Sequence, residues 1–207
     1  MAEPRGATGE TDRGLGRLAA FSDGVYAIAI TLLVLDVKVP QVEHGLGAAL
    51  AAQWPSYLGY VVSFVIIGIW WANHHRLLDG FARSDHALLQ LNTLHLMCIA
   101  FLPFATALLA DYLRHGGEES TAATAVYAGT LLFSALLFAA TWLYGARAGL
   151  LRAELTPAAV SWVSRQFGVS LLCYAVALGL AFLLPSASLA ICVAVALYYA
   201  LPRRRAA

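Results

Sequence analysis

The polar side chains best suited to chemistry in this sequence are embedded in apolar stretches. Ser22 and Asp23 open one such stretch, Asn73, His74 and His75 end a second, and Asn92 lies near the start of a third. Hydroxyl, carboxylate, imidazole and amide groups brought together could form a hydrogen-bonded network, a proton-transfer site or a metal site. Any of these three kinds of site requires the polar groups to lie close together in the fold. The positions of the helices that carry them therefore decide which kind of site can form.

A metal site and a catalytic centre are the least favoured of these. Two adjacent histidines provide fewer ligands than a zinc or di-iron site requires, and no nucleophile and base occur at a useful spacing. Cys98, Cys173 and Cys192 lack a CxxC spacing, so we predict inert thiols without a disulfide or a zinc site. The sequence therefore predicts neither an enzyme nor a bound cofactor.

The composition places the chain in a membrane. Of its 207 residues, 60% are hydrophobic and 12% are charged, whereas soluble domains carry about 25% charged residues. The formal net charge of +1 leaves no concentrated basic surface, so nucleic acid is not an expected partner.

Hydropathy predicts an all-α fold with six membrane-spanning helices. They are expected at residues 18–39, 50–73, 87–110, 120–146, 161–184 and 187–201. The last two divide one uncharged run, which as a single helix would measure about 54 Å and overshoot a bilayer core of about 30 Å, and Pro185 provides the turn. Residues 1–16 are expected to be a flexible tail and residues 203–207 a short basic tail, so that residues 17–202 form one transmembrane domain.

The positions of the basic residues predict the orientation of these spans. If the N-terminus is cytosolic, eleven of the 13 Lys and Arg residues fall on the cytosolic side, and only Lys38 and Arg114 lie outside. This asymmetry is strongest with six spans and both termini in the cytosol. The opposite face carries Asp36 and other acidic residues, so it should attract cations.

The first span has two different faces at 100° per residue. Asp23 shares one face with Ala27, Ile30 and Val34, which we expect to pack inside the protein because an intramembrane carboxylate requires partners or water. The other face, about 120–180° away, is an aliphatic stripe formed by Ile28, Leu32 and Leu35, with Thr31 at its edge. Periodicity alone favours lipid contact or packing for this stripe over pore lining.

The depth of the polar groups predicts a helix-clamp network. The cytosolic ends of spans one, two and three carry the polar residues at similar depth. A hydrogen-bonded cluster of Ser22, Asp23, Asn92 and one of His74 and His75 would compensate the buried charge and fix the first helix against its neighbours. We favour this structural role over proton coupling. Arg17 is expected at the headgroups or in a pair across helices.

The run RxxxFSDG at 17–24, followed by VYAIAITLLVLD, resembles the first-helix signature of the transmembrane protein 175 family of potassium channels. The resemblance extends to WANHHR at 71–76, to Asp85 and Asn92, and to LPF at 102–104. Arg17, Phe21 and Asn73 stand within these motifs, and we include them in the expected helix-clamp network. Spans four to six match in hydropathy alone.

The resemblance implies a pore around the first helix. Bacterial members carry one six-helix unit per chain and form plasma-membrane homotetramers, whereas the animal proteins of endosomes and lysosomes carry two units. The family's apolar constriction corresponds to Ile28, Leu32 and Leu35, and Thr31 corresponds to a hydroxyl that contributes to ion preference. Because a backbone-carbonyl filter is not part of the family, we expect a weakly selective, potassium-preferring cation channel with Asp36 at the pore mouth.

Two other functions stay open. A secondary transporter would need a midplane substrate site with broken helices, but Asp23 lies near one surface and Pro103 is the obvious breaker in the first three spans. A non-conducting membrane scaffold would use the same helices without a passage. The family resemblance, and not the periodicity, favours the channel over both alternatives.

Overall fold

The apolar stretches of the sequence form long helices in the computed structural model, which describes residues 5–113 and 116–200. The elements in chain order are α1 (Arg5–Leu32), the 3-10 helix η1 (Leu33–Asp36), α2 (Leu46–Ala52), α3 (Trp54–Asp79), α4 (His86–Tyr112), α5 (Gly117–Arg147), α6 (Pro157–Ala181) and α7 (Pro185–Ala200). The all-α fold class is thereby confirmed. The basic segment 203–207 lies outside the described residues.

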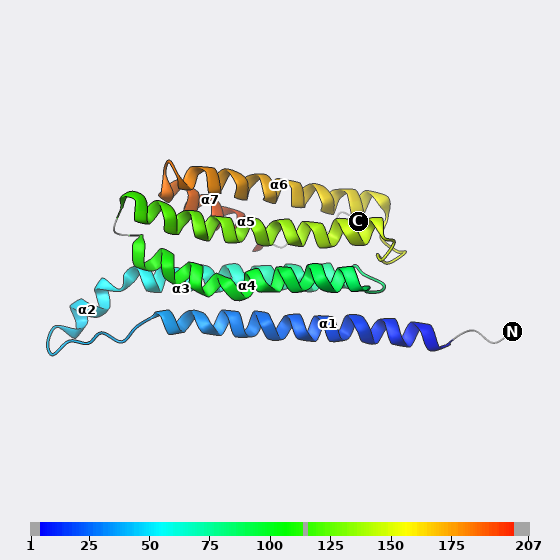
Figure 1. The fold of residues 1–207 in the computed structure, drawn as a ribbon, viewed down its shortest axis with the longest axis horizontal. Helices are drawn as coiled ribbons and strands as arrows, with labels where there is room; N and C mark the ends of the chain where they lie inside the picture. The colour runs from blue at the N-terminus through cyan, green and yellow to red at the C-terminus, as the bar shows by residue number, and fades with distance from the viewer. Residues whose placement is uncertain (1–4, 114–115, 201–207) are drawn as a thin grey trace.

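The long helices run side by side as an elongated bundle (Figure 1). α4 packs against α5, α5 against α6, and α6 against α7, so most contacts join neighbours in the sequence. α1 lies at one edge of the bundle, where it packs on α3 and α4. One whole side of α1 is therefore left without a neighbour within the chain.

Among residues 5–113 and 116–200, length and hydropathy identify five helices that could cross a membrane. These are 14–36, α3, α4, α5 and α6. α7 is apolar but has 16 residues, which measure about 24 Å against a hydrocarbon core of about 30 Å. The sixth predicted span is thus present as a shorter helix that begins at Pro185, where the sequence predicted the break.

The structure differs from the sequence prediction at the N-terminal segment. α1 begins at Arg5, so the helix starts well before residue 18, where we expected the first span to begin; that residues 1–16 form a flexible tail stays a prediction. Extending an existing helix costs far less than starting one, because each added residue gains a hydrogen bond. A short helix, α2, also precedes α3 where the sequence predicted one continuous span.

The two loops at the arginine-rich end pair with each other. The Ala82 amide donates to the Leu150 carbonyl at 2.8 Å, and the Arg152 amide donates to the Gly80 carbonyl at 2.9 Å. Phe81 fills the space between them, fully buried against Gly145. This pairing ties the α3–α4 connection to the α5–α6 connection and fixes how α4 enters the bundle.

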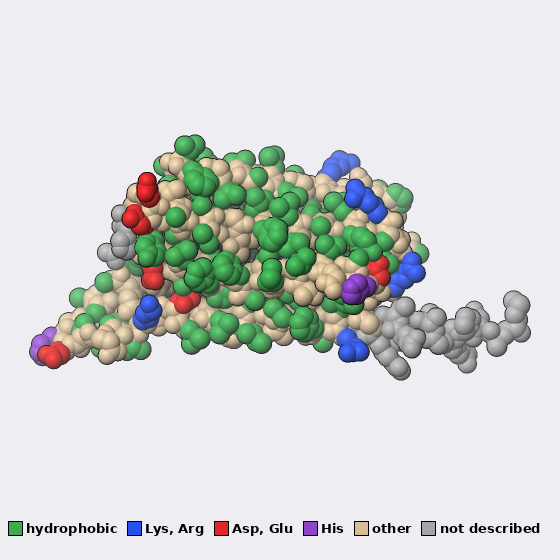
Figure 2. Space-filling view, viewed as in Figure 1, with side chains coloured by type: hydrophobic (Ala, Val, Ile, Leu, Met, Phe, Trp, Pro, Cys, Tyr) green, Lys and Arg blue, Asp and Glu red, His purple; other side chains and the backbone are tan. Residues whose placement is uncertain are grey.

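Charged side chains gather at the two ends of the bundle. On the face shown in Figure 2, most Lys and Arg side chains lie at the end where α1 begins and most Asp and Glu side chains at the opposite end, with hydrophobic side chains between. An apolar girdle between charged ends is the surface expected of a protein that spans a bilayer.

Candidate functional site

α1 buries the face that carries Ser22 and exposes the aliphatic stripe. Leu18, Ser22, Tyr26 and Ala29 of α1 are all buried, at the i, i+3, i+4 spacing of one helix face, and Leu33 at the start of η1 is buried as well. By contrast, the exposed fractions of the aliphatic stripe are large, with 62% for Ile28, 41% for Leu32 and 70% for Leu35. The stripe therefore points away from the rest of the chain.

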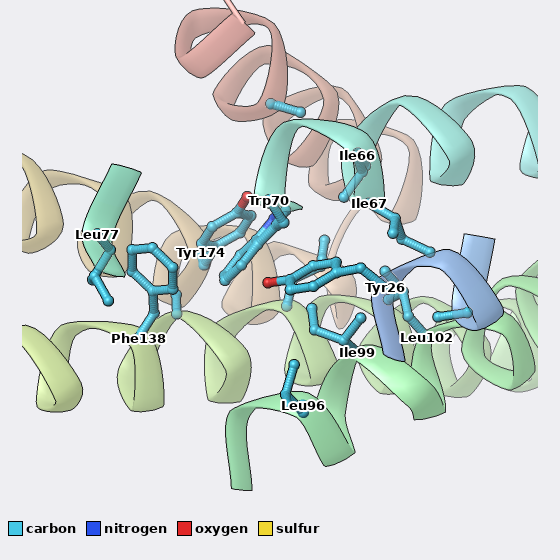
Figure 3. Close-up of a cluster of buried hydrophobic side chains, with 14 of the residues drawn as sticks. Tyr26, Ile66, Ile67, Trp70, Leu77, Leu96, Ile99, Leu102, Phe138 and Tyr174 are labelled. Atoms are coloured by element: carbon cyan, nitrogen blue, oxygen red, sulfur yellow. The ribbon is translucent and has the colours of Figure 1, made fainter. Parts of the chain in front are cut away.

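The structure corrects the predicted packing face of this helix. We expected Ala27 and Val34 to pack beside Asp23, but both are exposed. The buried face is rotated about one residue toward Ser22, because that rotation inserts the large Tyr26 ring into the core between α1, α3 and α4 (Figure 3).

A chain of hydrogen bonds joins α1 to α4 and α3. The Asn92 side-chain amide donates to Ser22 Oγ at 3.1 Å, and Ser22 Oγ donates to the Leu18 carbonyl at 2.8 Å. His74 Nε2 lies 2.7 Å from Asn92 Oδ1 and donates to it, because a carbonyl oxygen only accepts. All three polar side chains are buried. Their hydrogen bonds to one another replace the bonds to water that each loses, and such bonds are stronger at low dielectric.

A second polar connection runs from α1 through α4 to α5. The Tyr26 hydroxyl lies 2.7 Å from His95 Nε2, and His95 Nδ1 lies 3.3 Å from the Ser134 carbonyl oxygen. Ser134 Oγ also lies 3.2 Å from His95 Nδ1. Because the carbonyl oxygen can only accept, we assign the ring proton to Nδ1, so that Nε2 accepts from Tyr26. The His95 ring stacks on His74 at a centroid distance of 5.6 Å, which brings the two networks into one polar core.

The aromatic side chains of the core surround these histidines. Trp70 stacks on His95 at 5.5 Å, and Phe138 meets the same ring edge-on at 5.4 Å. Figure 3 shows Tyr26, Trp70, Tyr174 and Phe138 converging from four helices. The rings exclude the lipid phase from the polar core, which strengthens the hydrogen bonds inside it.

Asp23 has a different partner from the one expected. Its Oδ1 accepts from Trp71 Nε1 at 2.8 Å, and no hydrogen bond joins it to His74 or Asn92 among the described residues. The helix geometry explains this, because Asp23 lies 100° around α1 from Ser22 and faces the exposed side of α3. A tryptophan indole can donate only one hydrogen bond, and that of Trp71 is accepted by Asp23.

The other predicted clamp residues lie outside the polar core. His75 and Arg17 are exposed, and Asn73 is half-buried on a different face of α3. Phe21 is 58% exposed, beside the aliphatic stripe. The structure thus brings Ser22, His74 and Asn92 together and leaves these four residues apart from them.

Thr31 and Asp36 lie on and beyond the aliphatic stripe. The Thr31 hydroxyl is 3.0 Å from the Ala27 carbonyl oxygen and 2.9 Å from that of Ile28, so it is bonded to its own helix while its side chain is exposed. Asp36 ends η1 and is half-buried. The 3-10 turn therefore carries the carboxylate at the acidic end of the bundle.

Sequence reasoning missed Tyr26, Trp71 and Ser134 as members of these networks. A signal was available for Tyr26, since a tyrosine four residues after Ser22 shares its helix face. The pairing of Trp71 with Asp23 had no such signal. No group of three or more metal-ligating side chains occurs in the described residues, and the three cysteines are free thiols.

Comparison with known proteins places these features in a family. The model of a family described as "Endosomal/lysosomal potassium channel TMEM175" matches residues 17–103. A relative from Streptomyces collinus is 48% identical over 89% of this chain and 90% of its own length, and one from Chamaesiphon minutus is 44% identical over 90% and 93%. The chain belongs to the TMEM175 family. The matched residues carry α1, α3 and most of α4, which hold the polar core.

The fold has a solved counterpart in the same family. A crystal structure of a lysosomal potassium-selective channel TMEM175 homolog from Chamaesiphon minutus is 41% identical, covers 90% of this chain and 96% of that one, and superposes with a TM-score of 0.79. Together with the apolar helices, family membership establishes a multi-pass membrane protein. The family is one of ion channels and not of enzymes.

Proposed function

We propose that this protein is a potassium-preferring, weakly selective cation channel in which four copies of α1 surround a central pore. The observation that carries the proposal is the exposed aliphatic stripe of Ile28 and Leu32 on α1 and Leu35 on η1, while the opposite face of α1 is fixed by buried hydrogen bonds. A helix that only contacted lipid would not require so many directional contacts behind it. A pore-lining helix does, because its rotation sets the pore radius.

The chemistry of the stripe determines the kind of selectivity. Aliphatic side chains cannot replace the oxygen ligands of a hydrated ion, so a ring of four Ile28 side chains would act by narrowness and by dewetting. Leu32 and Leu35 would extend this neck toward the acidic end, with Thr31 as a polar ring and Asp36 at the mouth. Preference for potassium over sodium should then be modest.

The hydrogen bonds behind the stripe would keep the four pore helices at one rotation. Asn92 connects Ser22 to His74, and Trp71 connects α3 to Asp23. A one-residue rotation of α1 would break these contacts and move Ile28 by about 100° around the helix. The clamp thus acts as a positioning device for the constriction.

The names of the relatives support potassium as the permeant ion. The Streptomyces collinus and Chamaesiphon minutus proteins are each named a potassium channel. The human relative, 38% identical over 50% of this chain and 22% of its own length, is named a proton channel. A plasma-membrane location with both termini in the cytosol fits the separation of basic and acidic side chains at the two ends of the bundle.

Flux through reconstituted protein tests the proposal. The purified full chain is placed in liposomes with a potassium gradient, and potassium efflux and single-channel current are measured. A homotetramer that passes ions at channel rates supports the proposal. Stoichiometric, saturable exchange would indicate a secondary transporter, and an intact oligomer without flux would indicate a scaffold; either result would overturn the channel function.

A further inference from the structure

A groove on the outside of the bundle is not used by the proposed pore. It has a volume of about 300 Å³ and runs along α3, with the last turn of α7 as its second wall. Its lining comprises Phe64, Val65, Gly68, Ile69, Ala72, Asn73, Arg76, Tyr199 and Ala200. The α3 members follow the i, i+3, i+4 spacing, so they form one continuous helix face.

The groove changes from apolar to basic along its length. Phe64 and Val65 lie near the middle of α3, and Asn73 and Arg76 lie near its end. From Phe64 to Arg76 the helix rises about 18 Å, close to half of a hydrocarbon core of about 30 Å. The groove therefore spans one leaflet, with its polar residues at headgroup depth.

The floor of the groove is open because α3 has small residues there. A Cβ added at Gly68 would meet no atom within 4 Å. Ala72 follows one turn later, so the two small residues leave an open furrow on the surface of α3 between the larger Phe64 and Ile69 side chains. α7 contacts α3 beside this opening, so the second wall of the groove belongs to the same chain.

The charges select among the possible occupants. Arg76 is exposed, and within the described part of the chain no acidic residue lines the groove. Residues 203–205 are all arginine, and their charge disfavours the C-terminal segment as the group that fills a groove ending at Arg76. A molecule with an anionic head group and a hydrocarbon tail would match the groove, with its head at the basic end and its tail at the apolar end.

We propose that this groove binds an anionic phospholipid, with one acyl chain along Gly68 and Ala72 and the phosphate beside Arg76 and Asn73. Arginine donates two parallel hydrogen bonds to a phosphate, and the asparagine amide adds a third donor. None of the stripe residues Ile28, Leu32 and Leu35 lines the site. A lipid there would hold α3 against α7 at the depth where α3 also carries His74.

Native mass spectrometry of the purified full-chain assembly tests the site. The protein in detergent is mixed with equal amounts of dioleoyl phosphatidylglycerol and dioleoyl phosphatidylcholine. The detergent is then removed in the mass spectrometer, and the lipids that stay bound are counted. We expect phosphatidylglycerol to be retained in preference. Arg76→Gln should lower its retention about fivefold, the effect of one basic contact with an anionic lipid, and Arg76→Lys should keep most of it.

Two further variants separate the groove from general surface effects. Arg165→Gln removes an exposed arginine of α6 that does not line the groove and should leave retention unchanged. Gly68→Leu, whose Cβ would meet no atom within 4 Å, places a side chain on the floor of the groove and should lower the retention of both lipids. Equal effects of Arg76→Gln and Arg165→Gln, or full lipid retention by Gly68→Leu, would overturn the proposal. A changed oligomeric mass for Gly68→Leu would show that a second copy covers the groove, which also overturns it.

Discussion

The Tyr26 hydroxyl and His95 Nε2 are 2.7 Å apart although 69 residues separate them in the chain. This contact sets the rotation of α1, because the tyrosine ring can enter the core only when the Ser22 face is turned inward. The same rotation turns Ile28 outward. One buried hydrogen bond on the inner face is therefore coupled geometrically to the exposed stripe on the outer face.

Removal of the Tyr26 hydroxyl should destabilise the protein without leaving a cavity. Tyr26→Phe keeps the ring but leaves His95 Nε2 without a donor, which costs roughly 1–2 kcal/mol for a buried acceptor. Thermal unfolding in detergent measures the loss. Tyr60→Phe is the matched control, since Tyr60 is a half-buried tyrosine of α3. Equal melting temperatures for the two variants would show that the Tyr26–His95 contact contributes nothing.

A polar side chain at the centre of the aliphatic stripe should change ion selectivity. Ile28→Asn supplies oxygen ligands and wets the neck, so the permeability ratio of sodium to potassium should rise toward 1. Reversal potentials under a sodium and potassium gradient measure it. Leu172→Asn alters an equally exposed residue of α6 and should leave the ratio unchanged. An unaltered ratio in Ile28→Asn would remove this residue from the constriction.

Acid should weaken the connection between α4 and α5 at the arginine-rich end. Asp85 caps α4 by accepting from the Leu88 amide at 2.9 Å, and it also accepts from the Tyr144 hydroxyl at 2.6 Å. The Tyr144 hydrogen bond, followed by the Leu88 amide, lowers the pKa of Asp85 below its ordinary value of 3.8. A lowered folded-state pKa stabilises the protein above pH 3.8, and that stabilisation is lost as the pH falls through the folded-state value.

The melting temperature as a function of pH tests this linkage. Wild-type protein should lose stability below about pH 4. Tyr144→Phe should lower the melting temperature at neutral pH and reduce its decrease in acid, because the variant removes the largest cause of the lowered Asp85 pKa. Asp85→Asn should also be less sensitive to acid. If Tyr144→Phe retains the full acid dependence, the tyrosine does not set the Asp85 pKa.

A methyl group on Gly145 should destabilise the loop pairing. A Cβ there would overlap the ring of Phe81, which is fully buried and cannot move outward freely. Gly145→Ala should therefore cost about 1–3 kcal/mol through overpacking. Gly179→Ala, where a Cβ meets no atom within 4 Å, should be neutral or stabilising because alanine favours the helix. Unfolding curves in detergent that rank the two variants in the opposite order would contradict the close packing of Phe81.

Hydropathy determined where the helices lie, because the transfer of each apolar segment into a membrane depends on its own residues alone. The stretches around α4 and α5 agree with the structure to within a few residues, and α7 begins at Pro185, two residues before the expected start of the last span. The ends of α1 and α3 were less accurate, since polar residues can extend a helix beyond its apolar span at little cost.

The sequence by itself determined the membrane class, the helix positions and the motif of α1, since these depend on local composition and spacing. Only the tertiary structure decided which face of α1 is buried and which partner each polar group takes. Both faces of α1 are apolar, so hydrophobic contrast does not distinguish lipid from core in a membrane. The pairs Asp23 with Trp71 and Asn92 with Ser22 are 48 and 70 residues apart. Contacts at such separations are fixed by how whole helices pack, which no single segment encodes.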